Sequence, residues 1–292
     1  MGLTKKVARE EASRKDIAVA LKGQFNMLHS MNYFDDYEME EILLRQKQLE
    51  LTYIKNRFEL PQGLVQFSPS GADKCSRELF YKINKAKKDD VQSFPYQKRW
   101  QRNSTFVHEA VQRDILYMTK MLKNPSFKID FIETEFGLLP AWEKNIQKYK
   151  IIEHNGVTFV LYGMMDGIMT YKDGSKVGFE FKTKSVQPDR VAKLKGPSRS
   201  HKMQTVAYSL LYDIDEYIIF YESVAKDEWR AGAYAMDDMN AFYVKVTEKQ
   251  KLALLDKMAA IAEQAETGEL PDRQTSKCMF CPYKNICLVG VE

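Results

Sequence analysis

The sequence predicts an α/β or α+β fold in which strands are bracketed by helices. Apolar residues recur at helical spacing in the first sixty residues and again at 97–122, and alternating strand patterns fill the middle of the chain. Of the 292 residues, 44% are hydrophobic and 12% are aromatic, which is sufficient for a large core. We therefore expect one main domain with an appendage.

Residues 1–62 form the predicted appendage, and residues 63–292 form the main domain. The first segment is dense in charge and has apolar positions that indicate two or three helices. Pro61-Gln62-Gly63 ends it. This helical N-terminal extension is expected to pack on the main body or to bind a partner, including a second copy. A solvated appendage with no separate role is the alternative.

The main domain is expected to begin with a loop in which Ser70 or Asp73 can cap a helix that starts near Cys75. The elements expected after it are a helix at 97–122, strands at 130–137, 157–170 and 176–184, a helix at 198–212, strands near 216–222 and 230–236, and a helix at 238–267. Asp173-Gly174 predicts a hairpin, and Gly268 stops the last helix.

Composition excludes several classes of protein. The net charge is +4, from 44 Lys plus Arg against 40 Asp plus Glu, which does not demand a nucleic-acid partner. No stretch approaches eighteen apolar residues, so a membrane span is not expected. An N-terminal apolar run is also missing, so we expect a cytoplasmic protein without disulfides. No G-x-x-x-x-G-K-[ST] loop is found, so no ATP motor is expected.

Four cysteines have a spacing that predicts a metal site. Cys278, Cys281 and Cys287 lie near the C-terminus, and Cys75 lies about two hundred residues upstream. Zinc sites usually combine two close pairs of ligands, whereas four thiolates at irregular spacing suit a 4Fe-4S cluster. The cluster is the favoured interpretation; zinc and unligated buried thiols remain alternatives.

The strand at 176–184 carries the candidate chemistry. Its alternation directs Phe179 and Phe181 into the core and places Glu180 and Lys182 on the opposite face. Asp166 lies across the hairpin, so a carboxylate from each strand can hold Mg²⁺ or Mn²⁺. Lys182 can then orient water and offset transition-state charge. An exposed hairpin with a Glu-Lys surface pair is the alternative.

These motifs together resemble the PD-(D/E)xK nucleases of the RecB/AddB-like iron-sulfur branch, which includes the CRISPR-associated RecB-like exonucleases. Five features occur in that family's order: Ser68-Pro-Ser-x4-Cys75-x-Arg77-x3-Tyr81; His108-Glu109 in a helix; Gly163-x2-Asp166-Gly167 followed by Glu180-Phe-Lys182; Gln204-x3-Tyr208; and Cys278-x2-Cys281-x5-Cys287. The resemblance covers about residues 65–290. One departure is Ser104, where the family usually has glycine.

The resemblance implies a restriction-endonuclease-like mixed sheet flanked by helices, with a C-terminal iron-sulfur staple. It implies His108, Asp166 and Glu180 as metal ligands, with the carbonyl of Phe181, and Lys182 as the catalytic lysine. Two further residues, Gln204 and Tyr208, would line the site and position the DNA strand. The cluster ligands would be Cys75, Cys278, Cys281 and Cys287.

Basic residues after the catalytic strand fit a DNA substrate. The predicted phosphate contacts are Lys184, Arg190, Lys193, Lys195, Arg199 and Lys202. A second group, Lys98, Arg99, Trp100 and Arg102, has a composition suited to stacking a base. The expected function is a standalone Mg²⁺- or Mn²⁺-dependent exonuclease on single-stranded or frayed DNA ends. A subunit of a complex such as one for CRISPR spacer acquisition, or a non-catalytic iron-sulfur DNA-binding protein, is the alternative.

Overall fold

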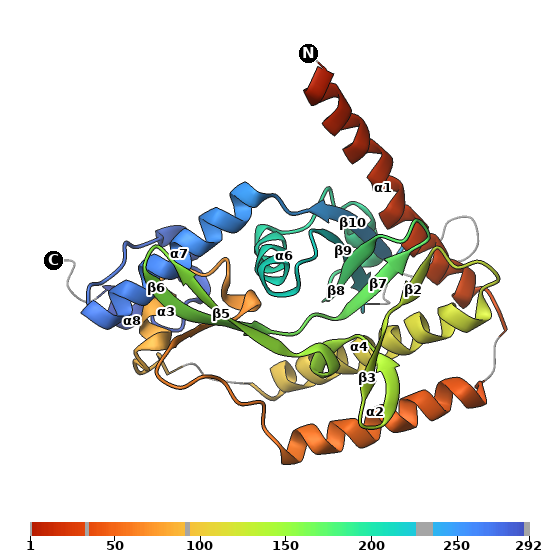
Figure 1. Ribbon diagram of the computed structural model, residues 1–292, viewed down its shortest axis with the longest axis horizontal. Helices are drawn as coiled ribbons and strands as arrows, with labels where there is room; N and C mark the ends of the chain where they lie inside the picture. The colour runs from red at the N-terminus through yellow and green to blue at the C-terminus, as the bar shows by residue number, and fades with distance from the viewer. Residues whose placement is uncertain (1, 33–34, 91–93, 226–235, 289–292) are drawn as a thin grey trace.

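Two sheets meet at the centre of the molecule (Figure 1). The computed structural model describes every residue except 1, 33–34, 91–93, 226–235 and 289–292. One sheet has the order β10-β9-β8-β7-β2, the second has the order β1-β6-β5, and β3 and β4 form a separate hairpin. The strands are β1 Val65–Phe67, β2 Phe127–Ile129, β3 Phe131–Thr134, β4 Gly137–Pro140, β5 Lys148–His154, β6 Val157–Gly163, β7 Gly167–Tyr171, β8 Lys176–Lys184, β9 Glu216–Ser223 and β10 Met239–Lys245.

Helices surround both sheets. They are α1 Gly2–His29, α2 Tyr37–Lys55, α3 Ser76–Ile83, α4 Pro95–Met121, α5 Pro188–Ala192, α6 Arg199–Tyr212, α7 Glu248–Thr267 and α8 Lys284–Leu288, with short 3-10 helices η1 Pro69–Gly71, η2 Glu143–Ile146 and η4 Thr275–Phe280. Among the helices that the structure describes, none has both the length and the apolar character needed to cross a bilayer. The sheets are mixed, because β8 runs parallel to β9 and antiparallel to β7. The predicted mixed α/β architecture is confirmed.

The hairpin that carries the candidate chemistry forms as predicted. β7 pairs antiparallel with β8, and Gly174 at the turn has a φ of 87°, a conformation that favours glycine. The predicted strand at 157–170, however, is two strands that belong to different sheets. β6 ends at Gly163 and β7 begins at Gly167, so Asp166 lies in the break where the chain passes from one sheet to the other.

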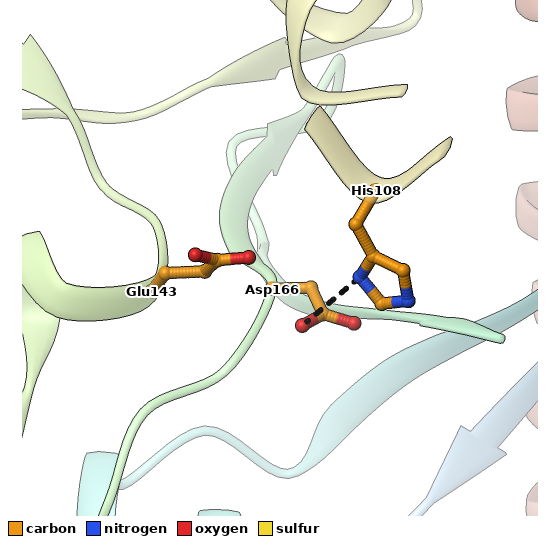
Figure 2. Close-up of side chains that lie close together, drawn as sticks. All are labelled: His108, Glu143 and Asp166. Carbon is orange, nitrogen blue, oxygen red and sulfur yellow. Dashed lines mark ion pairs between the residues drawn. The ribbon is translucent and has the colours of Figure 1, made fainter. Parts of the chain in front are cut away.

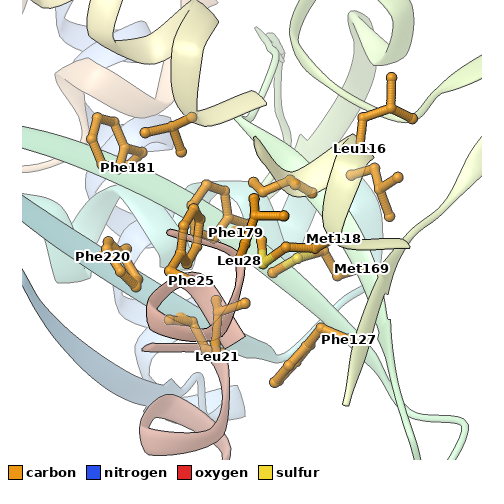
Figure 3. Close-up of a cluster of buried hydrophobic side chains, with 14 of the residues drawn as sticks. Leu21, Phe25, Leu28, Leu116, Met118, Phe127, Met169, Phe179, Phe181 and Phe220 are labelled. Atoms are coloured by element: carbon orange, nitrogen blue, oxygen red, sulfur yellow. The ribbon is translucent and has the colours of Figure 1, made fainter. Parts of the chain in front are cut away.

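The second half of α1 is part of the main core. Leu21, Phe25 and Leu28 are buried together with Phe179 and Phe220 of the central sheet (Figure 3). The rings of Phe25 and Phe220 have centroids 4.8 Å apart. The N-terminal half of α1 projects from the body, and α2 lies beside α4 (Figure 1). The second half of α1 thus packs on the main body. For this second half, the alternative of a solvated appendage is excluded.

A second core joins the three-stranded sheet to α3, α6 and α7. Phe67 of β1 and Phe159 of β6 meet edge to face, with ring centroids 5.5 Å apart. Val206 and Leu211 of α6 and Leu254 of α7 pack in the same cluster. Tyr208 of α6 also stacks on Tyr217 of β9 in the central sheet. This helix therefore lies between the two sheets.

The C-terminal part of the predicted order needs two corrections. The helix predicted at 238–267 begins only at Glu248, because residues 239–245 form β10 and pair with β9. Thr247 caps α7 and exchanges hydrogen bonds with Gln250 in a capping box, a signal that the sequence analysis missed. The strand predicted near 230–236 lies almost wholly outside the described residues. Upstream of this region, β1 and β5 were not predicted, and the single strand predicted at 130–137 is instead the antiparallel hairpin of β3 and β4.

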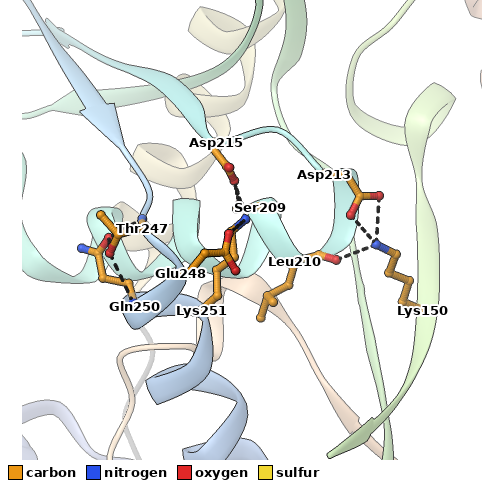
Figure 4. Close-up of polar contacts among 9 residues, drawn as sticks. All are labelled: Lys150, Ser209, Leu210, Asp213, Asp215, Thr247, Glu248, Gln250 and Lys251. Carbon is orange, nitrogen blue, oxygen red and sulfur yellow. Dashed lines mark hydrogen bonds and ion pairs between the residues drawn. The ribbon is translucent and has the colours of Figure 1, made fainter. Parts of the chain in front are cut away.

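Polar contacts fix the C-terminal end of α6 (Figure 4). Lys150 Nζ donates to the carbonyl oxygen of Leu210 over 2.9 Å and pairs with Asp213 over 2.7 Å. Asp215 accepts from Ser209 over 2.5 Å and pairs with Lys251 over 2.7 Å. These bonds tie α6 to β5 and to α7, so the helix that carries the predicted Gln204 and Tyr208 is held at one end by two neighbours.

Candidate active site

Three potential metal ligands converge from three separate elements. His108 comes from α4, Glu143 from η2, and Asp166 from the break before β7 (Figure 2). One ligand atom of each lies within 4.8 Å of the other two, and His108 Nδ1 is 3.9 Å from Asp166 Oδ1. The set of one imidazole and two carboxylates matches the donors that a divalent cation takes in proteins.

Close packing holds Asp166 in place. A Cβ atom at Gly163 would lie 2.7 Å from Cδ of Pro69, so only glycine allows β6 to end against the Ser-Pro-Ser segment. Asp166 Oδ2 then accepts a hydrogen bond from the main-chain amide of Phe181 over 2.7 Å. The glycine and the proline of the predicted motifs thus meet where β6 ends, three residues before Asp166.

Glu143 is the member of this group that the sequence analysis missed. Its φ of 41° lies in the left-handed region, and its amide donates to the carbonyl oxygen of Met165 over 2.8 Å, directly beside Asp166. Burial raises the pKa of Glu143. No local pattern distinguishes this residue from an ordinary surface glutamate. Only the packing of η2 against the β6–β7 break brings it to the site.

Glu180 lies beneath this group and is 1% exposed, so the surface-pair alternative is wrong. Phe179 and Phe181 are in the core as predicted. The opposite face of β8 is also covered. Glu180 Oε1 pairs with Lys182 Nζ, whereas Glu180 Oε2 is buried without a hydrogen-bond partner among the described residues. A buried carboxylate oxygen without a partner is costly, and it fits the place of a cation ligand.

The electrostatics of the site are dominated by burial. Burial raises the pKa of Asp166 and of Glu180, and for Glu180 the charge of Asp166 adds to the effect. Burial alone would lower the pKa of Lys182, but the two carboxylates outweigh it and raise this pKa. Burial lowers the pKa of His108. At neutral pH the site thus offers a neutral imidazole and a charged ammonium.

The residues predicted on α6 lie beside Glu180. Gln204 Nε2 donates to the hydroxyl of Tyr208 over 2.8 Å, and Tyr208 is buried. Burial and then the charge of Glu180 raise the pKa of Tyr208 well above its usual range. His201, one turn earlier, contacts the hydroxyl of Tyr221 through Nδ1 over 2.6 Å. Burial, and then the charge of Lys182, lowers the pKa of His201 to about 4.

An acidic cavity of about 500 Å³ between α2 and α4 opens beside Glu143. Its lining includes Glu40 and Glu50 of α2 and Glu109 of α4. Its two cations, Lys47 and Arg113, are both paired with carboxylates. The cavity is therefore an unfavourable place for an anion.

The predicted phosphate contacts lie at the end of β8 and in the segment that follows it along the chain. Lys184 is half-buried, with its ammonium 5.1 Å from the ring centroid of Tyr221. The other five are exposed: Arg190, Lys193, Lys195, Arg199 and Lys202. Two of them have acidic neighbours, since Lys193 pairs with Asp189 over 2.9 Å and Arg199 pairs with Asp73 over 3.1 Å.

The C-terminal tail packs against the segment that contains Cys75. Arg77 Nε donates to the carbonyl oxygen of Pro271 over 2.6 Å, and Lys277 pairs with Asp73 over 2.8 Å. Burial raises the pKa of Cys281, and Cys75 and Cys278 are near enough to add to this effect. Among the described residues, however, the thiols do not form a compact group with sulfur atoms within 4.8 Å of one another.

The sequence profile of the PD-(D/E)XK nuclease superfamily matches residues 71–288. The chain belongs to this superfamily. The match spans every predicted site motif except the Ser-Pro-Ser start, and it fits the observed mixed sheet with flanking helices. Within the matched region, Asp166 in the break before β7 and Glu180 and Lys182 of β8 lie close together.

Solved structures similar to this PD-(D/E)XK protein have low sequence identity to it. The structure of SSO0001 has 15% identity and a TM-score of 0.44, with 89% of this chain and 100% of that chain covered. An alkaline exonuclease from Laribacter hongkongensis has 9% identity and a TM-score of 0.43, with 70% and 89% covered. A phage-related exonuclease from Haemophilus somnus has 9% identity and a TM-score of 0.36, with 69% and 93% covered. No curated protein matches the sequence.

Proposed function

We propose that the protein is a metal-dependent deoxyribonuclease that hydrolyses phosphodiester bonds as a standalone exonuclease on single-stranded or frayed DNA ends. Its context would be DNA recombination, repair or processing. The observation that carries the proposal is the convergence of His108, Glu143 and Asp166 beside the buried Glu180-Lys182 pair. Carboxylates and an imidazole can hold a divalent cation, and an ammonium beside them can stabilise charge in phosphodiester hydrolysis.

Mg²⁺ or Mn²⁺ is the proposed cofactor of this site. The buried Oε2 atom of Glu180, which has no hydrogen-bond partner among the described residues, and the raised pKa values of two neighbouring carboxyl groups are consistent with a cation-binding site. His108, Asp166, Glu180 and the carbonyl of Phe181 would hold it, with Glu143 as a further ligand. When bound, a divalent cation lowers the pKa of a water molecule and offsets charge on the phosphate.

Lys182 is the residue that we propose stabilises the negative charge of the transition state. Its ammonium stays protonated because two carboxylates raise its pKa, and it lies on the same strand face as Glu180. A fixed ammonium can orient the attacking water and stabilise the charge that develops on the phosphoryl oxygens. Gln204 and Tyr208 would line the site and position the strand.

DNA is the proposed substrate because basic residues follow the catalytic strand. Five exposed Lys and Arg side chains between 190 and 202 supply phosphate contacts whose strength falls with salt. The acidic cavity at Glu143 leaves this basic side as the approach for the strand. The bound metal ion, the DNA backbone and Lys182 would then come together near the end of β8.

A 4Fe-4S cluster bound by Cys75, Cys278, Cys281 and Cys287 is the proposed structural cofactor. Its role would be to staple the C-terminal tail to α3, as in the RecB/AddB-like branch. The support is the packing of the tail on the Cys75 segment and the electrostatic proximity of Cys281 to Cys75 and Cys278. Zinc bound by the same four thiols is the alternative.

Two alternatives concern context. The protein could act only within an assembly, such as one for CRISPR spacer acquisition, with the N-terminal helices as the docking element. It could instead be a non-catalytic iron-sulfur DNA-binding protein. The buried Glu180-Lys182 pair argues against the second alternative, since a binding protein gains nothing from a partly unsatisfied buried carboxylate. We also propose that the protein is located in the cytoplasm.

The test is digestion of end-labelled DNA by the purified protein with Mg²⁺, Mn²⁺ or EDTA. We expect metal-dependent release of short products from single-stranded ends, and none from Lys182→Ala protein. Lys172→Ala, at the other end of the same hairpin, is the matched control and should cleave normally. Cleavage by Lys182→Ala at the normal rate would contradict the mechanism, and wild-type protein inactive with both metals would contradict the nuclease.

A further inference from the structure

Three aromatic side chains lie exposed at the start of α4. Phe94, Tyr96 and Trp100 are 40%, 42% and 63% exposed. The rings of Phe94 and Tyr96 are stacked with centroids 5.7 Å apart, and those of Tyr96 and Trp100 meet edge to face at 4.9 Å. We call these three residues the α4 aromatic patch. A contiguous group of exposed rings is typical of a binding surface.

The charge around the α4 aromatic patch identifies the partner. Lys98, Arg99 and Arg102 are exposed, and residues 94–106 contain no Asp or Glu. Arg99 follows Tyr96 by three positions, so both lie on one face of the helix. Rings interleaved with cations suit a polyanion that carries flat, stackable groups, which is the chemistry of a nucleic-acid strand with unpaired bases.

The patch is anchored to the proposed active site. Ser104 Oγ lies 2.8 Å from Thr183 Oγ1, and Thr183 directly follows Lys182. Ser104 thus joins α4 to the strand that carries Lys182. His108 lies one turn further along the same helix. Trp100 is two turns before His108, or about 12 Å along the helix axis.

We propose that Trp100, supported by Tyr96 and Arg99, stacks an unpaired base of single-stranded DNA about three to four nucleotides from the scissile phosphate. The number follows from the separation of about 12 Å between Trp100 and the proposed metal ligand His108, divided by the rise of about 3.4 Å per nucleotide of a stacked strand. This inference rests on the proposed function and assigns its substrate class. Stacking between neighbouring base pairs buries both faces of a base inside a duplex, so stacking on Trp100 selects for an unpaired strand.

Binding without cleavage tests the patch. Full-length protein in EDTA is titrated into fluorescently labelled oligothymidylate, and anisotropy reports the Kd. Trp100→Ala should weaken binding about tenfold or more, the effect of losing one stacked base, whereas Trp100→Phe should retain most of the affinity. Arg99→Gln should lower the slope of log Kd against log salt by about 0.7.

Tyr37→Ala is the matched control. Tyr37 is an exposed aromatic residue that begins α2, near the far end of α4, where Asp36 pairs with Lys120. Its replacement should leave the Kd unchanged. A single abasic site moved along the oligonucleotide locates the contact: one position should weaken wild-type binding, and this effect should vanish in Trp100→Ala protein.

The outcomes separate this inference from the proposed function. Equal Kd values for wild type and Trp100→Ala, or an equal loss with blunt duplex DNA, would overturn the inference while leaving the nuclease assay untouched. Tighter binding of an RNA oligonucleotide than of DNA would also overturn it. Protein that cleaves no DNA with either metal, yet loses affinity for single strands on Trp100→Ala, would support the patch and contradict the nuclease.

Discussion

The carboxylate of Asp166 accepts a hydrogen bond from the main-chain amide of Phe181, and this bond joins the β6–β7 break to the residue before Lys182. The same carboxylate lies 3.9 Å from the imidazole of His108. One residue thus holds together the strand, the break and the helix of the site. Its environment penalises the charge that it needs, since burial raises its pKa.

Asp166→Asn should separate stability from activity. The amide keeps the shape and removes a buried negative charge, so the metal-free protein should be at least as stable as wild type at pH 8. Nuclease activity should fall about 100-fold or more, as for other single electrostatic contacts in active sites. Thermal unfolding in EDTA and digestion of labelled DNA measure the two effects. Wild-type activity in this variant would contradict the assignment.

Glu143→Gln tests the ligand that no motif predicts. Loss of one carboxylate from the group should weaken Mn²⁺ binding about 10- to 100-fold, which isothermal titration calorimetry measures directly. Glu133→Gln on β3 is exposed and serves as the control. If the two variants bind Mn²⁺ equally, Glu143 is a neighbour of the metal site and not a ligand.

The stability of metal-free protein should fall as pH rises. The folded-state pKa values of Asp166 and Glu180 are raised to about 6 and about 7, so between about pH 4 and 7 the folded state binds more protons than the unfolded state. Unfolding free energy therefore decreases with pH across this window. Urea unfolding in EDTA should show the decrease, and Glu180→Gln should flatten it. Mg²⁺ should restore more stability at pH 8 than at pH 5.

Phe25→Ala should destabilise the whole domain. Its ring is 1% exposed and packs on Phe220, so removal should cost about 3–5 kcal/mol in chemical unfolding. Val19→Ala on the same helix, at 71% exposure, should change little. A separate early transition in Phe25→Ala protein, with the rest unfolding as in wild type, would show that α1 is an independent appendage.

Cys281→Ala tests the proposed cluster. Anaerobically purified wild-type protein should be coloured and contain iron, and the variant should lose the metal together with folding or DNA binding. Met279→Ala, which is 79% exposed between Cys278 and Cys281, is the control and should keep the metal. A colourless, zinc-containing wild type would replace iron with zinc and leave the nuclease proposal intact.

Local signals predicted the β7–β8 hairpin correctly, whereas contacts between distant segments were not predictable. The turn at Asp173-Gly174 and the alternation of Phe179 and Phe181 fixed β7, β8 and their inward face. β10 resembled the start of a helix, because its pairing with β9 is a tertiary property. Glu143 was missed for the same reason. Its place depends on how η2 packs against Met165.

The contact between Phe25 and Phe220 also constrains synthesis of the protein. The two rings are 195 residues apart in sequence, yet they belong to the same hydrophobic core, which also includes Phe179 and Phe181 of β8. A growing chain therefore completes α1 long before the strand that covers it has left the ribosome. This core forms through contacts between residues that are far apart in sequence, and such contacts form slowly. The apolar face of α1 therefore stays exposed until β9 has been made. The first helix is the first part to be made and among the last to be buried.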